Sequence, residues 1–134
     1  MKANEIIIPY HISNTFIREH PRLIFVFGQD YQEKGTFGQA GVAYGEPNCY
    51  MVPTCRKMCK SNRYWSDTEF DEVAMYIDEA IRRIPQDGRP IIPFPKIGMG
   101  ASQMNFLAPK LFAYLTKKLD SIKYPNIIIK YNEN

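Results

Sequence analysis

Two glycine-rich segments stand out as places where this chain could bind a charged ligand. Residues 26–40 and 94–102 each follow an apolar run and precede a pattern typical of a helix. Glycine lets the backbone approach a phosphate closely, and a helix N-terminus supplies unpaired N–H groups. The sequence therefore predicts a pair of phosphate-binding loops. The residues expected to contact the ligand through their backbone, or to line the ligand site, are Gly28, Gly35, Gly38, Ala40, Ile97, Gly98, Met99 and Gly100.

Polar side chains in the same segments are the candidates for chemistry. Asp30 could act as a general base or accept a hydrogen bond from a ribose hydroxyl, and it could equally be an ordinary turn aspartate. Gln29 and Gln39 could hydrogen-bond a sugar or a phosphate, whereas Lys34 and Lys96 could pair with phosphate or remain solvated. Ser102 is a further candidate ligand-binding residue, and it could instead simply cap the helix that follows it, a role that would still aim backbone N–H groups at an anion.

The sequence does not support the other common nucleotide-binding motifs or a zinc site. Neither loop contains G-K-[ST] or a clean G-x-G-x-x-G. Cys49, Cys55 and Cys59 are odd in number and lack zinc-ligand spacing, so we expect free thiols, no metal and no cofactor. A basic stretch (Arg56, Lys57, Lys60 and Arg63) could be a solvated loop or could meet a phosphate-bearing partner.

Hydrophobic patterning predicts which elements position these loops. Short apolar runs predict strands over residues 6–8, 22–27, 49–52, 90–94 and 127–129. Gly28 is expected to end the second strand and Pro53 the third, and residues 53–65 are expected to form a loop. The last of these strands is expected to be buried, like the first. A capping box, Ser66-x-x-Glu69, begins a helix that ends at Pro85. A second helix covers 104–122, with Pro109 as a candidate for its true first turn, and a short helix is expected over 36–43.

Strands that alternate with helices indicate an α/β fold. The chain has 134 residues, of which 45% are hydrophobic and 23% charged, which fits a single domain over 1–134. Because the strands are continuous apolar runs, we expect a mixed, mainly parallel central sheet with helices on both faces. A net charge of +3 is too small to indicate a nucleic-acid partner. No membrane partner is expected, a cytoplasmic location is expected, and a homodimer is the default oligomer.

The two loops resemble those of the macro domain family, whose members bind or hydrolyse ADP-ribose derivatives. The similarity lies in Lys34-Gly35-Thr36-Phe37-Gly38-Gln39-Ala40 and in Phe94-Pro95-Lys96-Ile97-Gly98-Met99-Gly100, over about residues 22–122. The resemblance implies a three-layer α/β/α domain whose loops hold the diphosphate and distal ribose. The chain is also similar to small uncharacterised bacteriophage proteins, which implies a viral origin and capture of an ADP-ribose-based host signal.

The same comparison favours binding over catalysis. Gly28-Gln29-Asp30 stands where many hydrolytic macro domains carry paired asparagines. We therefore expect a protein that sequesters an ADP-ribose-type, NAD-derived nucleotide. The first alternative is a hydrolase of ADP-ribosyl groups or ADP-ribose-1″-phosphate, with Asp30 activating water. The second is a protein-interaction module without a small ligand, which would dock through the basic stretch at residues 56–63.

Overall fold

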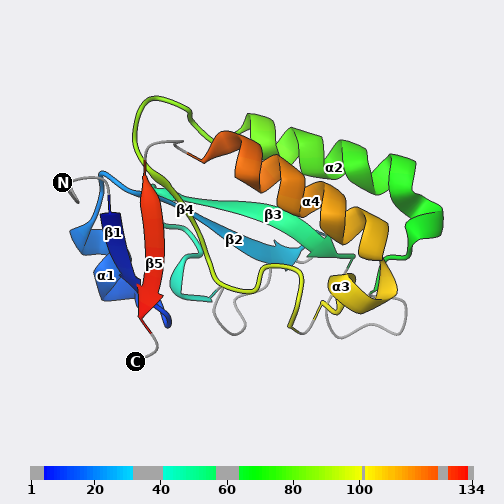
Figure 1. Cartoon of the computed structure of the whole chain (residues 1–134), viewed down its shortest axis with the longest axis horizontal. Coiled ribbons are helices and arrows are strands. Elements are labelled where there is room, and N and C mark those ends of the chain that lie inside the picture. Colours follow the sequence, from blue (N-terminus) through cyan, green and yellow to red (C-terminus); the bar gives the residue numbers. More distant parts are fainter. Residues whose placement is uncertain (1–4, 32–40, 57–63, 101, 124–126, 133–134) are drawn as a thin grey trace.

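The computed structural model describes residues 5–31, 41–56, 64–100, 102–123 and 127–132. These form an α/β fold in which every described strand pairing is parallel (Figure 1). The sequence predicted one central sheet. Instead, the described strands form a three-stranded sheet of order β3-β2-β4 and a separate pair, β1-β5.

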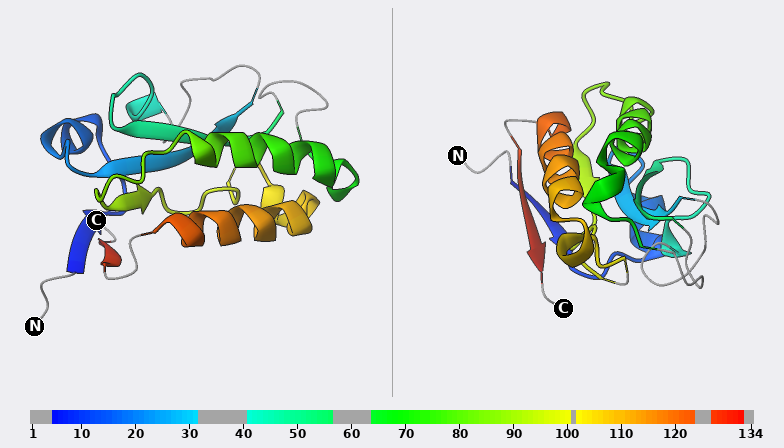
Figure 2. Two further views of the ribbon diagram at one scale, coloured as in Figure 1. Left: turned by 90° about the horizontal axis from the view of Figure 1, so that it is seen from above. Right: turned by 90° about the vertical axis from the view of Figure 1, so that its right-hand side faces the viewer.

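The central strand, β2 (Ile24–Asp30), is buried on both faces, which explains its unbroken apolar run. Ile24 and Val26 face the helices α2 (Phe70–Arg82) and α4 (Pro109–Ile122), which lie side by side (Figure 2). Phe25 and Phe27 face the opposite side, where they pack with residues of α1 and of the β1-β5 pair. One face is thus covered by two long helices and the other by a short helix and two strands.

The two flanking strands of the three-stranded sheet are β3 (Cys49–Cys55) and β4 (Ile91–Pro93). The prediction that Pro53 ends β3 was wrong, and so was the loop beginning there, because the strand continues to Cys55. β3 pairs only with β2 among the described strands, and an edge position tolerates a residue without an N–H donor. β2 likewise runs past Gly28 to Asp30, with a register shift between Gln29 and Asp30.

The outer strand pair consists of β1 (Glu5–Pro9) and β5 (Ile128–Asn132). The prediction that both are buried was wrong. Ile7 is 54% exposed and Ile128 is 59% exposed, so each strand buries only one face. Tyr131 donates a hydrogen bond to the Pro93 carbonyl, which ties β5 to the end of β4.

The helices follow the predicted pattern with two additions. The helix predicted from Ser66 begins with a 3-10 turn, η2 (Asp67–Glu69), and Glu69 accepts a hydrogen bond from the Ser66 N–H at 3.3 Å, as a capping box requires. The helix predicted over 104–122 is divided into α3 (Met104–Leu107) and α4, which begins at Pro109 as anticipated. Ala108 adopts φ −141°, because a residue before proline avoids the helical region.

The sequence analysis missed α1 (Asn14–Glu19), whose N-cap is Ser13. Asn48 holds this helix in place from the start of β3. Its side-chain amide lies 3.1–3.2 Å from the carbonyl oxygens of Ile17, His20 and Leu23. Asn48 is 5% exposed, so these contacts satisfy buried acceptors at the end of α1 and before β2. Residues 36–40 of the short helix expected over 36–43 lie outside the described residues.

No helix within the described ranges combines the length and the apolar character that crossing a membrane requires.

Replacing Asn48 tests whether this amide holds α1 to the sheet. Asn48→Ala should lower the free energy of unfolding by about 2–3 kcal/mol, because it removes three hydrogen bonds made by a buried amide. Urea unfolding followed by circular dichroism measures the change. Asn132→Ala, at an exposed position at the end of β5, is the control and should change the free energy by less than about 0.5 kcal/mol. Equal effects of the two variants would show that Asn48 is not a structural clamp.

Alkaline pH should destabilise the protein through two groups that burial keeps protonated. Burial, with a smaller contribution from Glu46, raises the pKa of Cys49 from 9.0 to about 12, and burial raises the pKa of Tyr131 from 10.0 to about 12. Both groups ionise first in the unfolded chain, so the stability they contribute is present below pH 9 and decreases between pH 9 and 12. The free energy of unfolding should decrease between pH 8 and pH 10.5, and this decrease should be smaller in the double variant Cys49→Ala, Tyr131→Phe than in the native chain. The same pH effect in both proteins would refute this assignment.

Candidate functional site

The carboxyl end of β2 and the turn after β4 meet, as the sequence predicted. Gly28 lies on the face of β2 toward α2 and α4. A Cβ at this position would lie 3.0 Å from Thr54 Cγ2 and 3.3 Å from Ile97 Cγ2. The absence of a side chain at Gly28 therefore lets Ile97 pack down onto the sheet. Gly28 and Ile97 are brought together, but packing alone is enough to explain why position 28 is glycine.

The two polar residues that follow Gly28 are buried. Gln29 is 6% exposed and Asp30 is 3% exposed. Asp30 lies opposite Cys55 at the register shift, and the next residue, Tyr31, donates its backbone N–H to the Cys55 carbonyl at 2.8 Å. A carboxylate buried at the end of a parallel strand is well placed for chemistry on a ligand in this region.

The segment after β4 forms the glycine-bearing turn that the sequence predicted. Met99 donates its N–H to the Lys96 carbonyl, and Asn105 donates its N–H to the Gly98 carbonyl, both at 3.0 Å. Lys96 has φ 64°, a left-handed conformation that costs a residue with a side chain roughly 1–2 kcal/mol. Such strain persists only where the surroundings impose it, and it is concentrated at functional sites.

The two glycines of this turn have different reasons for being glycine. Gly98 has φ 83°, and a Cβ there would lie 3.0 Å from a ring carbon of Phe112. Gly100 has no positive φ, and no atom of the described chain lies within 4 Å of a Cβ built on it. Packing and backbone conformation therefore explain Gly98. They do not explain Gly100, which leaves the backbone open to an approaching group.

The anion-binding role predicted for the last helix needs correction. Asp67 accepts hydrogen bonds from the backbone N–H groups of Lys110 and Leu111, both at 3.0 Å. These first-turn donors of α4 are therefore already used by a carboxylate from η2. Ser102 does not cap a helix, because the N-cap of α3 is Gln103 and that of α4 is Ala108. The backbone N–H groups of Gly100 and Ser102 make no hydrogen bond with another described residue.

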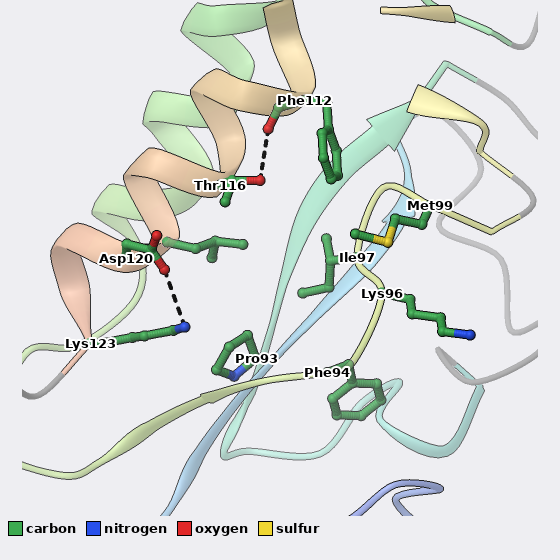
Figure 3. A pocket seen from close by; sticks show the side chains of 10 residues that line it. Pro93, Phe94, Lys96, Ile97, Met99, Phe112, Thr116, Asp120 and Lys123 are labelled. Atoms are coloured by element: carbon green, nitrogen blue, oxygen red, sulfur yellow. Dashed lines mark hydrogen bonds and ion pairs between the residues drawn. The ribbon is translucent and has the colours of Figure 1, made fainter. Parts of the chain in front are cut away.

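A pocket of about 260 Å³ lies between this turn and α4 (Figure 3). Its walls are mainly apolar and come from Pro93, Phe94, Ile97, Met99, Phe112 and Leu119. Thr116, Asp120 and Lys123 contribute polar atoms along the helix side, and Asp120 forms an ion pair with Lys123 at 3.2 Å. Lys96 also lines the pocket, but its ammonium extends away from α4 and lies 5.7 Å from the centre of the Tyr10 ring.

Several predicted site residues lie outside the described residues. These are the members of the first glycine loop, Lys34, Gly35, Gly38, Gln39 and Ala40, and three cations of the basic stretch, Lys57, Lys60 and Arg63. Within the described part of that stretch, Arg56 forms an ion pair with Glu69 of the capping box. Cys59 is also outside the described residues, and Cys49 and Cys55 are not joined in a disulfide. No cluster of potential metal ligands occurs among the described residues.

Sequence reasoning missed three contributors to this region: Asp67, Thr116 and Asp120. Asp67 directly follows the capping-box serine, and no local pattern reveals that it caps a helix more than 40 residues away. Thr116 and Asp120 are four residues apart in a predicted helix, so a shared face could have been inferred from their spacing. That this face borders a pocket depends on the turn after β4, which the sequence does not position.

Residues 7–118 match the model of a family described as "Family of unknown function (DUF7831)". No curated protein matches the chain, and no solved structure matches it. The resemblance to macro domains therefore rests on the motifs of the two loops.

The contrast between the two glycines of the turn predicts opposite effects on stability. Gly98→Ala should lower the free energy of unfolding by about 2 kcal/mol, because a left-handed backbone and an overpacked ring contact both oppose a Cβ. Gly100→Ala should leave it within about 0.5 kcal/mol of the native value. Thermal and urea unfolding of the two variants provide the comparison, and each variant serves as the other's control. A loss of stability in Gly100→Ala similar to that in Gly98→Ala would contradict the assignment of Gly100 to ligand access.

Proposed function

Because the chain belongs to the family of unknown function DUF7831, we propose a function from the site itself: the protein binds and sequesters an ADP-ribose-type, NAD-derived nucleotide. The observation that carries this proposal is the meeting of the end of β2 with the turn after β4, through Gly28 and Ile97. Gly28 belongs to the first glycine-rich segment, residues 26–40, and Ile97 belongs to the second, residues 94–102. The macro-like part of the first segment, residues 34–40, lies outside the described residues.

The turn after β4 supplies what a phosphate group requires. The backbone N–H groups of Gly100 and Ser102 make no hydrogen bond within the described chain. Gly100 carries no side chain that would hinder an approaching oxygen, and the space around it is open. Charge-assisted hydrogen bonds from backbone N–H groups to an anion are short and strong. Lys96, exposed in the same turn, adds a mobile positive charge.

Hydrolysis is the second candidate, and the burial of Asp30 supports it. A carboxylate that is 3% exposed at the carboxyl end of a central strand is shielded from water, as catalytic carboxylates often are. In this case Asp30 would take a proton from a water molecule that attacks the ribose carbon bearing the leaving group. Binding is preferred because Gly28-Gln29-Asp30 stands where many hydrolytic macro domains carry paired asparagines.

Titration with ADP-ribose tests the proposal. The native chain should bind ADP-ribose, and at 100 times the dissociation constant the ligand should add about 2.7 kcal/mol to the unfolding free energy. Gly100→Leu should bind at least tenfold more weakly, because the new side chain occupies the approach to the backbone donors. Lys117→Leu is the control, since it adds the same exposed side chain on α4 and should leave affinity unchanged. Isothermal titration calorimetry provides the affinities.

Recovery of the ligand separates the two candidate functions. After incubation with ADP-ribose-1″-phosphate, mass spectrometry of the small molecules should return this compound intact if the protein only sequesters its ligand, whereas hydrolysis would release ADP-ribose and phosphate. A new product would instead identify a hydrolase, and Asp30→Asn should then abolish product formation while leaving binding in place. If ADP-ribose, ADP-ribose-1″-phosphate and NAD all fail to bind, the proposal is wrong and a protein-interaction role becomes the leading explanation.

A further inference from the structure

The pocket between the turn after β4 and α4 has the size and lining of a site for a flat ring. Its volume, about 260 Å³, is just below the roughly 300–1,000 Å³ typical of pockets for larger organic ligands. Ile97 extends from the turn toward the helix, and Phe112 and Leu119 line the side of α4 (Figure 3). An apolar hollow of this size suits one heteroaromatic ring better than a sugar, whose hydroxyl groups would be left without partners.

The polar edge of the pocket presents hydrogen-bond acceptors. The Thr116 hydroxyl donates its hydrogen to the Phe112 carbonyl at 2.9 Å, so its oxygen offers only lone pairs to another group. One turn further along α4, Asp120 forms an ion pair with Lys123 at 3.2 Å, and its side chain is 62% exposed, so the carboxylate remains accessible to another donor. Acceptors beside an apolar wall select a flat ring that carries N–H or amino donors.

The pocket is continuous with the turn that supplies the phosphate donors. Met99 lines the pocket, and the next residue is Gly100, whose N–H makes no hydrogen bond with another described residue. A nucleotide with its phosphates at Gly100 and Ser102 therefore has this pocket beside it. The aromatic residues near the end of β2 offer a poorer base site, because Tyr31 and Tyr76 are stacked on each other with ring centres 4.2 Å apart.

We propose that this pocket holds the amino-bearing base of the nucleotide, with Asp120 and Thr116 accepting hydrogen bonds from it. This assignment rests on the proposed nucleotide-binding function and adds to it the position of the base and the residues that select it. It also gives a role to Thr116 and Asp120, the two acceptor-bearing side chains at the edge of an otherwise mainly apolar pocket.

Filling the pocket tests the assignment. Thr116→Trp should weaken ADP-ribose at least tenfold, because the indole occupies the space of the base. The same variant should bind ribose 5-phosphate, which lacks the base, as the native chain does. Thr116 and Lys117 are both exposed on α4, so Lys117→Trp is the matched control and should bind both ligands normally. Calorimetry measures ADP-ribose, and NMR titration measures the weaker ribose 5-phosphate.

Removing the acceptor tests the role of Asp120 separately. Asp120→Ala should weaken ADP-ribose about tenfold, the effect expected for a hydrogen bond to a charged group, and should not change the affinity for ribose 5-phosphate. Asp71→Ala, which removes an exposed carboxylate from α2, is the control.

The possible outcomes distinguish the two proposals. Selective loss of ADP-ribose in Thr116→Trp and Asp120→Ala supports the base site. Native affinity in both variants, or equal loss of both ligands, overturns the base site and leaves nucleotide binding intact. A native chain that binds neither ligand overturns nucleotide binding and, with it, the base site.

Discussion

The arrangement depends on one constraint, which is that the central strand β2 is apolar on both faces. Ile24, Phe25 and Val26 are each fully buried, so each side of the sheet needs a cover. Two long helices cover one side, and a short helix with an outer strand pair covers the other. The polar residues at the carboxyl end of β2 are thereby enclosed between layers. This places the region suited to a ligand at one end of the three-stranded sheet.

The glycines of the candidate site show that a motif can have mixed origins. Gly28 and Gly98 are explained by close packing against Ile97 and Phe112, and Gly98 also by its positive φ. Neither close packing nor a positive φ explains the glycine at position 100. In segments that resemble ligand-binding loops, packing is therefore enough to explain the glycines at positions 28 and 98. Packing does not require a glycine at position 100. The functional argument is carried by the position that the fold leaves unexplained.

Much of the fold could be predicted from the sequence because its signals are local. The capping box at Ser66, the apolar stripe of α2 and the proline at the start of α4 each specify their own element. What could not be predicted depends on distant partners. β3 continues through Pro53 because it lies at an edge, β1 and β5 are half exposed because they form a separate pair, and the N-terminus of α4 is capped by Asp67. The pocket depends in turn on how the segment after β4 runs beside α4.

The bond from Asp67 to the start of α4 has a consequence for the motions of the protein. One carboxylate lies in the first turn of the η2–α2 unit and also accepts two N–H groups of α4, so the two helices are joined at their N-termini as well as along their packed sides. Separating the two helices from each other breaks the cap that Asp67 provides for α4, which favours opening of the pair as one cooperative unit. The wall that α4 provides for the pocket is therefore expected to keep its shape for as long as this unit stays closed.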